Sequence, residues 1–298
     1  MTMAPQMSTR TVAGWFGSNR QSAARVGIEL GKLTWCGVPF CGGCPEIPHI
    51  RTRSGVASDL HRHLINLARC ITEPTLFDRL LAAVDAKLFH PDELATAQRR
   101  CIEREQADDL FAPSRADDVD HDPNWAADYF VACWMGRGGA AGKNTEFSQS
   151  LSTRWTAGGG DSAVRYRSAV DSLIGWRESL KRWSFECIDC FDFLDRVKDL
   201  DGHGLYVDAP WPDNGCEYKH CFTDSQQARL AARLSAFQAV RVVVRFGDHP
   251  LVRHLYPEGR WRWLCGCTRN QRNNEVSEVL IVNGPSHSEN ASPVTAAE

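Results

Sequence analysis

The feature of this sequence that most constrains its fold is a series of short apolar runs that alternate with helical patterns. The runs predict strands at residues 33–38, 55–59, 183–189, 204–208 and 241–246. Apolar residues that recur every three or four positions predict helices at residues 60–71, 75–106 and 224–237. Such an alternation is typical of an α/β fold with a mostly parallel sheet, in which ligands bind beyond the carboxyl ends of the strands.

The remaining segments are interpreted from their turns and composition. Two apolar runs at 261–267 and 276–282 predict a terminal hairpin. The acidic stretch 103–128 contains two prolines and predicts a surface loop, and the glycine-rich residues 136–162 predict an irregular, mobile surface segment. We expect Thr223 or Asp224 to cap the helix that follows them.

The chain has 298 residues, of which 43% are hydrophobic, so it can bury a core as one large domain or two modest ones. It has no apolar run long enough to span a membrane, and residues 1–11 lack the apolar stretch of a signal peptide. We therefore expect a cytosolic protein whose twelve cysteines are mostly reduced. The net charge of −3 excludes a uniformly basic nucleic-acid binder, but basic residues gather at 137–182 and 241–272. They can form a face for phosphates or be scattered and solvated.

One short motif carries chemistry of its own: Asp208-Ala209-Pro210-Trp211, at the end of a predicted strand. Asp208 and the carbonyl group of Ala209 can accept hydrogen bonds from the two N–H groups of a planar amine. Trp211 can stack on an aromatic ring, a contact worth roughly 1–3 kcal/mol, and Pro210 restricts the backbone that aims these groups. These parts suit methylation of an exocyclic amine, although the four residues in isolation are more typical of a turn with a core tryptophan.

Further motifs, taken in their order along the chain, resemble the Dam-like class of adenine-specific DNA methyltransferases, whose catalytic motif has the form Asp-Pro-Pro-Tyr. Residues 14–20 are similar to that family's N-terminal cofactor motif, and residues 38–43 to its Phe-x-Gly cofactor loop. Residues 56–59 look like its acidic strand end, and residues 190–193 like the segment that borders the cofactor's adenine. The resemblance covers roughly residues 14–283.

The resemblance implies a Rossmann-like sheet that binds S-adenosylmethionine and methylates the exocyclic N6 amine of adenine in DNA, with the target base flipped out of the duplex. It implies that Asp208, Ala209, Pro210 and Trp211 are catalytic, with Asp208 stabilising the positive charge that develops on the amine. The implied cofactor-binding residues are Trp15, Gly17, Asn19, Phe40, Gly42, Asp59, Asp192 and Phe193. Among them, Asp59 would accept from the ribose hydroxyls, while Asp192 and Phe193 would hold the cofactor's adenine.

The resemblance also implies a domain organisation. Residues 12–75 and 183–283 would form a discontinuous catalytic domain, 76–182 a helical and Gly/Arg-rich target-recognition insertion, and 1–11 and 284–298 disordered tails. The implied DNA-binding residues are Arg137, Lys143, Asn144, Arg154, Arg165 and Arg167. We expect a monomer or weak dimer in the cytoplasm of a bacterial or phage-infected cell.

Four positions depart from the family pattern. Asn19 stands where the family usually has Lys, Val38 where it has Glu, Cys44 where it has a third Gly, and Ala209 where it has the first Pro. Ala209 keeps the carbonyl acceptor, whereas the other changes leave open a decayed, non-catalytic nucleic-acid-binding homologue. A site that methylates RNA adenine or another planar amine is the other alternative. Taken singly, Asp59 can equally be the N-cap of the next helix.

Cysteine and histidine pairs raise the question of a metal. Cys41 and Cys44, Cys187 and Cys190, and Cys265 and Cys267 have metal-like or redox-like spacing. Two of these pairs could together form a four-thiolate zinc site, but buried, apolar thiols are the more common arrangement. His61 and His63 are two residues apart and lie on different sides of a helix, so we expect no metal there.

Overall fold

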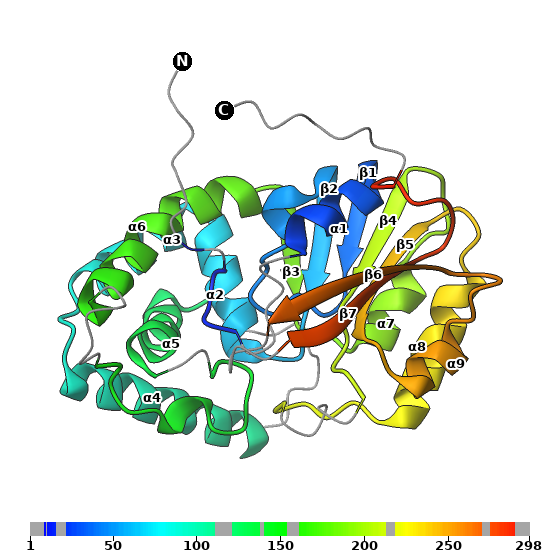
Figure 1. Ribbon diagram of the computed structural model, residues 1–298. Coiled ribbons are helices and arrows are strands. Elements are labelled where there is room, and N and C mark those ends of the chain that lie inside the picture. The colour runs from blue at the N-terminus through cyan, green and yellow to red at the C-terminus, as the bar shows by residue number, and fades with distance from the viewer. Residues whose placement is uncertain are drawn as a thin grey trace, which may run out of the picture. The chain divides into compact units, whose positions relative to one another are not determined.

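The computed structural model describes residues 9, 11–15, 22–110, 121–137, 140–153, 161–212, 218–269 and 275–289. Helices alternate with strands along these residues, which confirms the predicted mixed α/β class. The chain divides into two compact units, whose elements are labelled in Figure 1. The first unit consists of Met1–Ser18, Gly42–Pro45 and Ser58–Asp189. The second unit consists of Asn19–Cys41, Glu46–Ala57 and Cys190–Glu298.

The second unit is built on a sheet. Its strands are β1 (Lys32–Val38), β2 (Arg51–Ser58, all but the last residue), β4 (His203–Val207), β5 (Arg241–Gly247), β6 (Arg262–Arg269) and β7 (Glu275–Val282). They follow the spatial order β2-β1-β4-β5-β7-β6. β1 pairs in parallel with β2 and β4, and β4 with β5, whereas β7 is antiparallel to β5 and β6. The mostly parallel sheet and the terminal hairpin are confirmed, and the sheet is compatible with a Rossmann-like fold.

The centre of the interior strand β5 is apolar on both faces. Val242, Val243 and Val244 of β5 are all fully buried, as expected of a parallel strand covered by helices. The helices of this unit are α1 (Ala23–Leu30), the 3-10 turn η1 (Ile47–His49), α7 (Cys190–Arg196), α8 (Asp224–Ala236) and α9 (Pro250–Leu255). Thr223 caps α8 in a reciprocal capping box with Gln226, which confirms the predicted cap.

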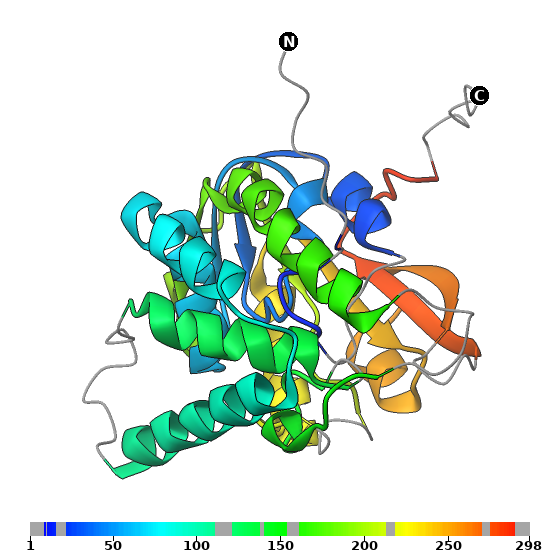
Figure 2. The same cartoon turned by 90° about the vertical axis from the view of Figure 1, so that its left-hand side faces the viewer.

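The first unit is helical around a buried central helix. Its elements are α2 (Arg62–Thr72), α3 (Pro74–Asp85), α4 (Pro91–Leu110), α5 (Pro123–Met135), the 3-10 turn η2 (Glu146–Ser148), α6 (Ser162–Leu180) and the strand β3 (Trp183–Glu186). α5 contacts α2, α3, α4 and α6, and Figure 2 shows α4 (teal) running beside α5 (green). α5 is apolar nearly all round, with Trp125, Tyr129 and Phe130 buried, so it forms the core of this unit.

Several helix predictions for the first unit need correction. The helix predicted at 75–106 is two helices, α3 and α4, separated at residues 86–90. Pro123, interpreted as a loop residue, is the first residue of α5, where proline is favoured because its missing N–H has no helical partner. Leu60 lies outside α2 and is 40% exposed. The helix α6 was not predicted. That residues 76–182 form a target-recognition insertion remains a prediction.

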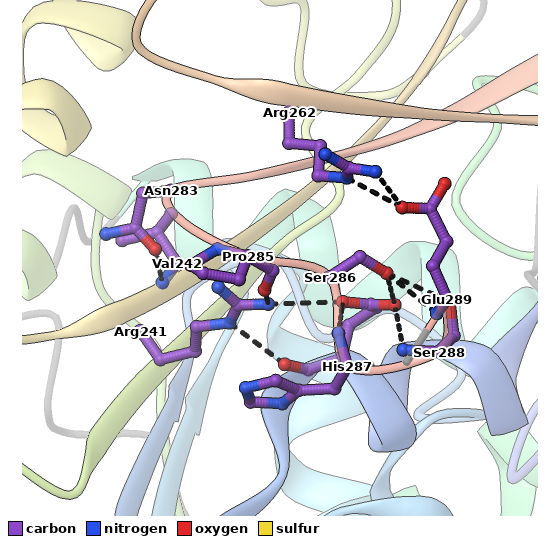
Figure 3. A network of polar contacts seen from close by, with 10 residues as sticks. Arg241, Val242, Arg262, Asn283, Pro285, Ser286, His287, Ser288 and Glu289 are labelled. Carbon is purple, nitrogen blue, oxygen red and sulfur yellow. Dashed lines mark hydrogen bonds and ion pairs between the residues drawn. The ribbon is translucent and has the colours of Figure 1, made fainter. Parts of the chain in front are cut away.

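A buried carboxylate anchors the end of the described chain in the second unit. Glu29 of α1 is fully buried, and it accepts hydrogen bonds from the Ser286 hydroxyl and the His287 and Ser288 backbone amides. Arg241 of β5 donates to Glu29 and to the Pro285 carbonyl, and Figure 3 shows Arg241 with the 285–289 segment. Burial raises the pKa of Glu29, but the hydrogen bonds hold it below its ordinary value. Residues 284–289, expected to be disordered, therefore follow a defined path.

Candidate functional site

The strand order of the second unit reverses between β1 and β4. These strands are neighbours, with Gly37 opposite Leu205. The next strand beyond β1 is β2, and the next strand beyond β4, on the other side, is β5. Ligands of open parallel sheets bind beyond the carboxyl ends of the strands at such a switch point. Phe40 follows the end of β1 and Asp208 follows the end of β4. The sheet of the second unit therefore places two predicted site residues at its ligand-binding edge.

The Asp208 carboxylate is held by side chains from three positions. Arg245 Nη1 donates to its Oδ2 at 2.8 Å, and the Tyr206 hydroxyl donates to the same oxygen at 3.4 Å. Trp211 Nε1 donates to Oδ1 at 3.3 Å. The Asp208 side chain is 18% exposed. Burial raises its pKa above the ordinary value, although Arg245 and Trp211 act in the opposite direction. Asp208 is thus oriented but still reaches the surface of this unit.

Arg245 connects Asp208 to a second carboxylate. Its Nη2 donates to Glu278 Oε2 on β7 at 2.9 Å, and the Ser22 hydroxyl donates to the other oxygen of Glu278 at 2.5 Å. Arg245 and Glu278 are both buried. The sequence reasoning did not single out Arg245, yet a signal was present. An arginine inside the apolar run of β5 is rarely buried without an anionic partner.

A third carboxyl group, that of Glu46, is linked to Asp208 through Tyr206. The Tyr206 hydroxyl donates to Glu46 Oε1 at 3.1 Å, and Glu46 is 4% exposed. Burial and the negative charge of Asp208 raise the pKa of Glu46 to about 8, although Arg245 opposes both. Glu46 is therefore mostly protonated at neutral pH. With Asp208 and Glu278 ionised, the cluster of these three carboxyl groups around Arg245 carries one net negative charge.

The backbone of the predicted catalytic turn is also held in place. Gln227 of α8, itself buried, donates from Nε2 to the Pro210 carbonyl at 2.6 Å. Ala209 is 1% exposed, whereas Pro210 and Trp211 are partly exposed. The Trp211 ring packs against Gly247, where an added Cβ would lie 2.9 Å from Cε3. The turn is thus fixed by neighbours that the sequence reasoning did not identify.

The second unit also contains an aromatic group made of Phe40, Phe222 and Phe191. Phe40 meets Phe222 edge-on with ring centroids 5.5 Å apart, and Phe222 stacks on Phe191 at 6.2 Å. The guanidinium of Arg229 covers the Phe191 ring at 3.8 Å. Because Phe40 and Phe222 are partly exposed, they can offer aromatic edges to a planar ligand.

The other two predicted cofactor residues of this unit differ from each other. Asp192 is exposed in the first turn of α7 and makes no hydrogen bond or ion pair with a described residue. Phe193 is 3% exposed and stacks on Trp35 at 6.5 Å. Phe193 is therefore a core residue here, which argues against its predicted stacking on the cofactor, whereas Asp192 is accessible to a ligand.

In the first unit, Asp59 is held by backbone amides. Its Oδ2 accepts from the Gly42 N–H and its Oδ1 from the His61 N–H, both at 3.0 Å. The N-cap of α2 is His61, whose Nδ1 accepts from the Leu64 N–H, so the alternative of Asp59 as the N-cap is wrong. Asp59 is partly exposed, and a carboxylate has about four acceptor positions, which leaves room for hydroxyl donors.

Trp15 of the first unit packs between two glycine loops. An added Cβ would lie 2.8 Å from Trp15 Nε1 at Gly42 and 2.7 Å from Cζ2 at Gly142. Both glycines have positive φ, 43° and 84°, which other residues rarely adopt. The indole also meets the His61 ring edge-on at 5.2 Å. The structure thus brings together Trp15, Gly42 and Asp59, three of the predicted cofactor residues.

A buried carboxylate not identified from the sequence orders the adjoining loop. Glu146 is 5% exposed and pairs through both oxygens with His61 Nε2, at 2.9 and 3.0 Å. It also accepts from the Gly142 N–H at 2.9 Å. Lys143 and Asn144, predicted to contact DNA, lie in the loop that Glu146 closes. A histidine–carboxylate pair 85 residues apart is not visible to local sequence patterns.

The other predicted DNA contacts are placed differently. Arg137 is exposed beyond the end of α5, and its backbone N–H donates to the Ser150 carbonyl. Arg165 and Arg167 lie on α6, where Arg165 donates to the Trp134 carbonyl and Arg167 forms an ion pair with Asp85. Gly17, Asn19 and Arg154 lie outside the described residues.

Asp59 in the first unit and Asp192 in the second each offer hydrogen-bond acceptors of a kind that S-adenosylmethionine would need. Asp59 has acceptor capacity for ribose hydroxyls, and Asp192 can accept from an exocyclic amine. Within the described part of the chain, no group of three His, Cys, Asp or Glu side chains is arranged to hold a metal ion. The described cysteines carry no disulfide, and no described helix has the length and apolar character needed to cross a bilayer.

In comparisons with known proteins, no family model and no curated protein matches this sequence.

Proposed function

We propose that this protein methylates the exocyclic N6 amine of adenine in DNA, with S-adenosylmethionine as the methyl donor. The observation that carries the proposal is the position of Asp208. It is a partly exposed carboxylate after β4, at the switch point of a mostly parallel sheet, and it opens the turn Asp208-Ala209-Pro210-Trp211. The resemblance of the sequence motifs to the Dam-like methyltransferases supports the choice of reaction.

The turn supplies the groups that amine methylation requires. The lone pair of an adenine amine is delocalised into its ring, so the site must accept hydrogen bonds from the amine as its nitrogen becomes tetrahedral. Asp208 accepts one N–H and the Ala209 carbonyl the other, while Trp211 stacks on the base. When bound, S-adenosylmethionine supplies an electrophilic methyl group on sulfur. The N6–carbon bond forms as the sulfur–carbon bond breaks, and the amine then loses one proton to water.

The net charge of the cluster suits this reaction. Positive charge develops on the amine nitrogen during methyl transfer, and a fixed anion beside it lowers the barrier. With Glu46 protonated, the cluster of Asp208, Arg245 and Glu278 carries one negative charge. In the first unit, Asp59 is assigned to the ribose hydroxyls of the cofactor, and Lys143 and Asn144 to DNA phosphates or bases.

The test is incorporation of label from S-adenosylmethionine into nucleic acid. Purified protein would be incubated with labelled cofactor and adenine-containing duplex DNA, single-stranded DNA or RNA, and the modified nucleoside identified by mass spectrometry. We expect N6-methyladenine in DNA. Label in RNA alone would replace the proposal with RNA methylation. Cofactor binding without transfer to any substrate would indicate a decayed, non-catalytic homologue.

A further inference from the structure

We propose that Arg245 is a positioning residue for the proposed methyl transfer, which holds the Asp208 carboxylate in place while Glu278 balances the arginine charge. The inference rests on the proposed function for its kinetic consequences only. The predicted effect of Arg245 on the Asp208 carboxylate can be measured without any substrate.

Arg245 contacts two side chains of the turn, those of Asp208 and Trp211. Nη1 reaches Asp208 at 2.8 Å and Nη2 reaches Glu278 at 2.9 Å, so the two ends of one planar guanidinium hold two carboxylates. Its Cζ lies 5.0 Å from the centroid of the Trp211 ring. Arg245 is only 6% exposed and sits on the buried strand β5, which restricts its movement. A lysine at this position cannot make the same forked contact.

Glu278 explains how a cation can support a reaction that creates positive charge. An Asp208–Arg245 pair alone would be neutral and would stabilise a developing cation poorly. Glu278 is 2% exposed and neutralises Arg245 from the opposite end, so the charge of Asp208 remains available to the amine. Arg245 then acts on Asp208 in two ways: it fixes the direction of the carboxylate and favours its ionised form.

The other groups around Asp208 do not replace Arg245. The Tyr206 hydroxyl on β4 lies within hydrogen-bonding distance of both Asp208 and Glu46, and Trp211 donates to Asp208 from the turn itself. Burial raises the pKa of Glu46 to about 8, so it contributes little charge at neutral pH. Tyr206, Trp211, Glu46 and Glu278 bring no positive charge to Asp208. Arg245 supplies the positive charge that opposes protonation of Asp208.

The experiment compares Arg245→Met and Arg245→Lys with the unaltered protein. Asp208 would be titrated by ¹³C NMR of labelled aspartate carboxyl groups, with Asp208→Asn used to assign its signal. We expect Arg245→Met to raise the titration midpoint of Asp208 by about one pH unit or more, because an opposite charge within 4–6 Å lowers a carboxyl pKa by roughly 1–3 units. Arg245→Lys should largely restore the midpoint. An unchanged midpoint in Arg245→Met would overturn the inference.

Methyl-transfer kinetics supply the second measurement. We expect Arg245→Met to lower kcat roughly 10–100-fold at pH 7 with the KM for S-adenosylmethionine within about twofold, and its kcat to recover partly as the pH rises. A raised KM with unchanged kcat would indicate a binding role and contradict the proposal. If the unaltered protein transfers no methyl group, the proposed function fails, and the NMR titration alone decides the inference.

Folding needs its own control, because Arg245→Met leaves the buried Glu278 and the partly exposed Asp208 without their cation. The double variant Arg245→Met with Glu278→Gln removes one of these charges, and it should be more stable than Arg245→Met. A structural role alone predicts that the double variant regains activity together with stability. Positioning by Arg245 predicts that kcat stays low although folding improves.

Discussion

Asp59 and Asp208 are both carboxylates that follow a strand of the sheet, but they are held in different ways. Asp59 accepts from two backbone amides, those of Gly42 and His61. Asp208 is held by the side chains of Arg245, Trp211 and Tyr206. Backbone amides fix a carboxylate without adding a titratable charge, whereas side chains can set its charge as well as its direction. The two carboxylates therefore differ in what sets their charge and their direction.

The largest effect should come from Asp208→Asn. The amide keeps the size of the side chain but removes the negative charge, so we expect kcat to fall about 10²–10³-fold or more, as for loss of one transition-state stabilising group. Affinity for S-adenosylmethionine, measured by calorimetry, should stay within about twofold. Asp248→Asn is the matched control, because Asp248 also follows a strand but is exposed and pairs with Arg253. Equal turnover by Asp208→Asn and the unaltered protein would refute the catalytic assignment.

The reverse pattern is expected for Asp59→Ala. Hydrogen bonds to charged groups contribute about 1.5–3 kcal/mol, so affinity for S-adenosylmethionine should fall roughly 10–100-fold. At saturating cofactor, kcat should change little. Circular dichroism would check that the variant remains folded. If its cofactor affinity matched that of the unaltered protein, Asp59 would have no ribose contact and its bonds to Gly42 and His61 would be purely structural.

A smaller effect is expected when the support of Asp59 is altered and Asp59 itself is kept. In Gly42→Ala, the new Cβ would lie 2.8 Å from Trp15 Nε1 at a φ of +43°, so the loop must shift and move its amide away from Asp59. We expect a loss of about 1–3 kcal/mol in stability and a severalfold loss in cofactor affinity. Gly259→Ala is the control, since no atom lies within 4 Å of its added Cβ. Equal stability of the two variants would contradict this account of Gly42.

The smallest effect on activity is expected for Glu46→Gln, which tests the charge of the Asp208 cluster. Burial raises the pKa of Glu46 from 4.5 to about 8, so its contribution to stability is complete below pH 4.5 and is lost as the pH rises through 8. The variant should therefore be more stable than the unaltered protein by at least about 1 kcal/mol at pH 8, with little difference at pH 4. Urea unfolding at several pH values measures this. Parallel pH dependences would mean that Glu46 is ionised in the folded protein.

Much of the fold could be predicted from local patterns. The run of valines in β5, the terminal hairpin and the Thr223 cap are signals contained within a few residues, and all three are confirmed. α5 was missed because Pro123 was interpreted as a breaker, although Asp122 before it caps the helix and proline is favoured at a first position. Sequence order alone could not tell which of these two readings applied.

The candidate site could be predicted only in part. Asp208 and Asp59 lie at the ends of predicted strands and within recognisable motifs, so both could be selected as candidates from the sequence. Their partners are remote: Arg245 lies 37 residues from Asp208, and Gln227 lies 17 residues from Pro210. For Phe193 the local motif was misleading about packing. The motif suggested contact with a ligand, but the ring stacks on Trp35 and is buried. Side-chain partnerships across strands depend on the sheet order, which local patterns do not specify.

The pairing of β1 with β4 has a consequence for synthesis on the ribosome. Gly37 leaves the ribosome long before Leu205, its neighbour in the sheet. At about 5–20 residues per second, the interval is on the order of ten to thirty seconds. During that time β1 has an open edge on the side that β4 will cover. Chaperones that bind extended apolar segments of nascent chains would therefore raise the yield of this protein more than that of one whose paired strands are consecutive.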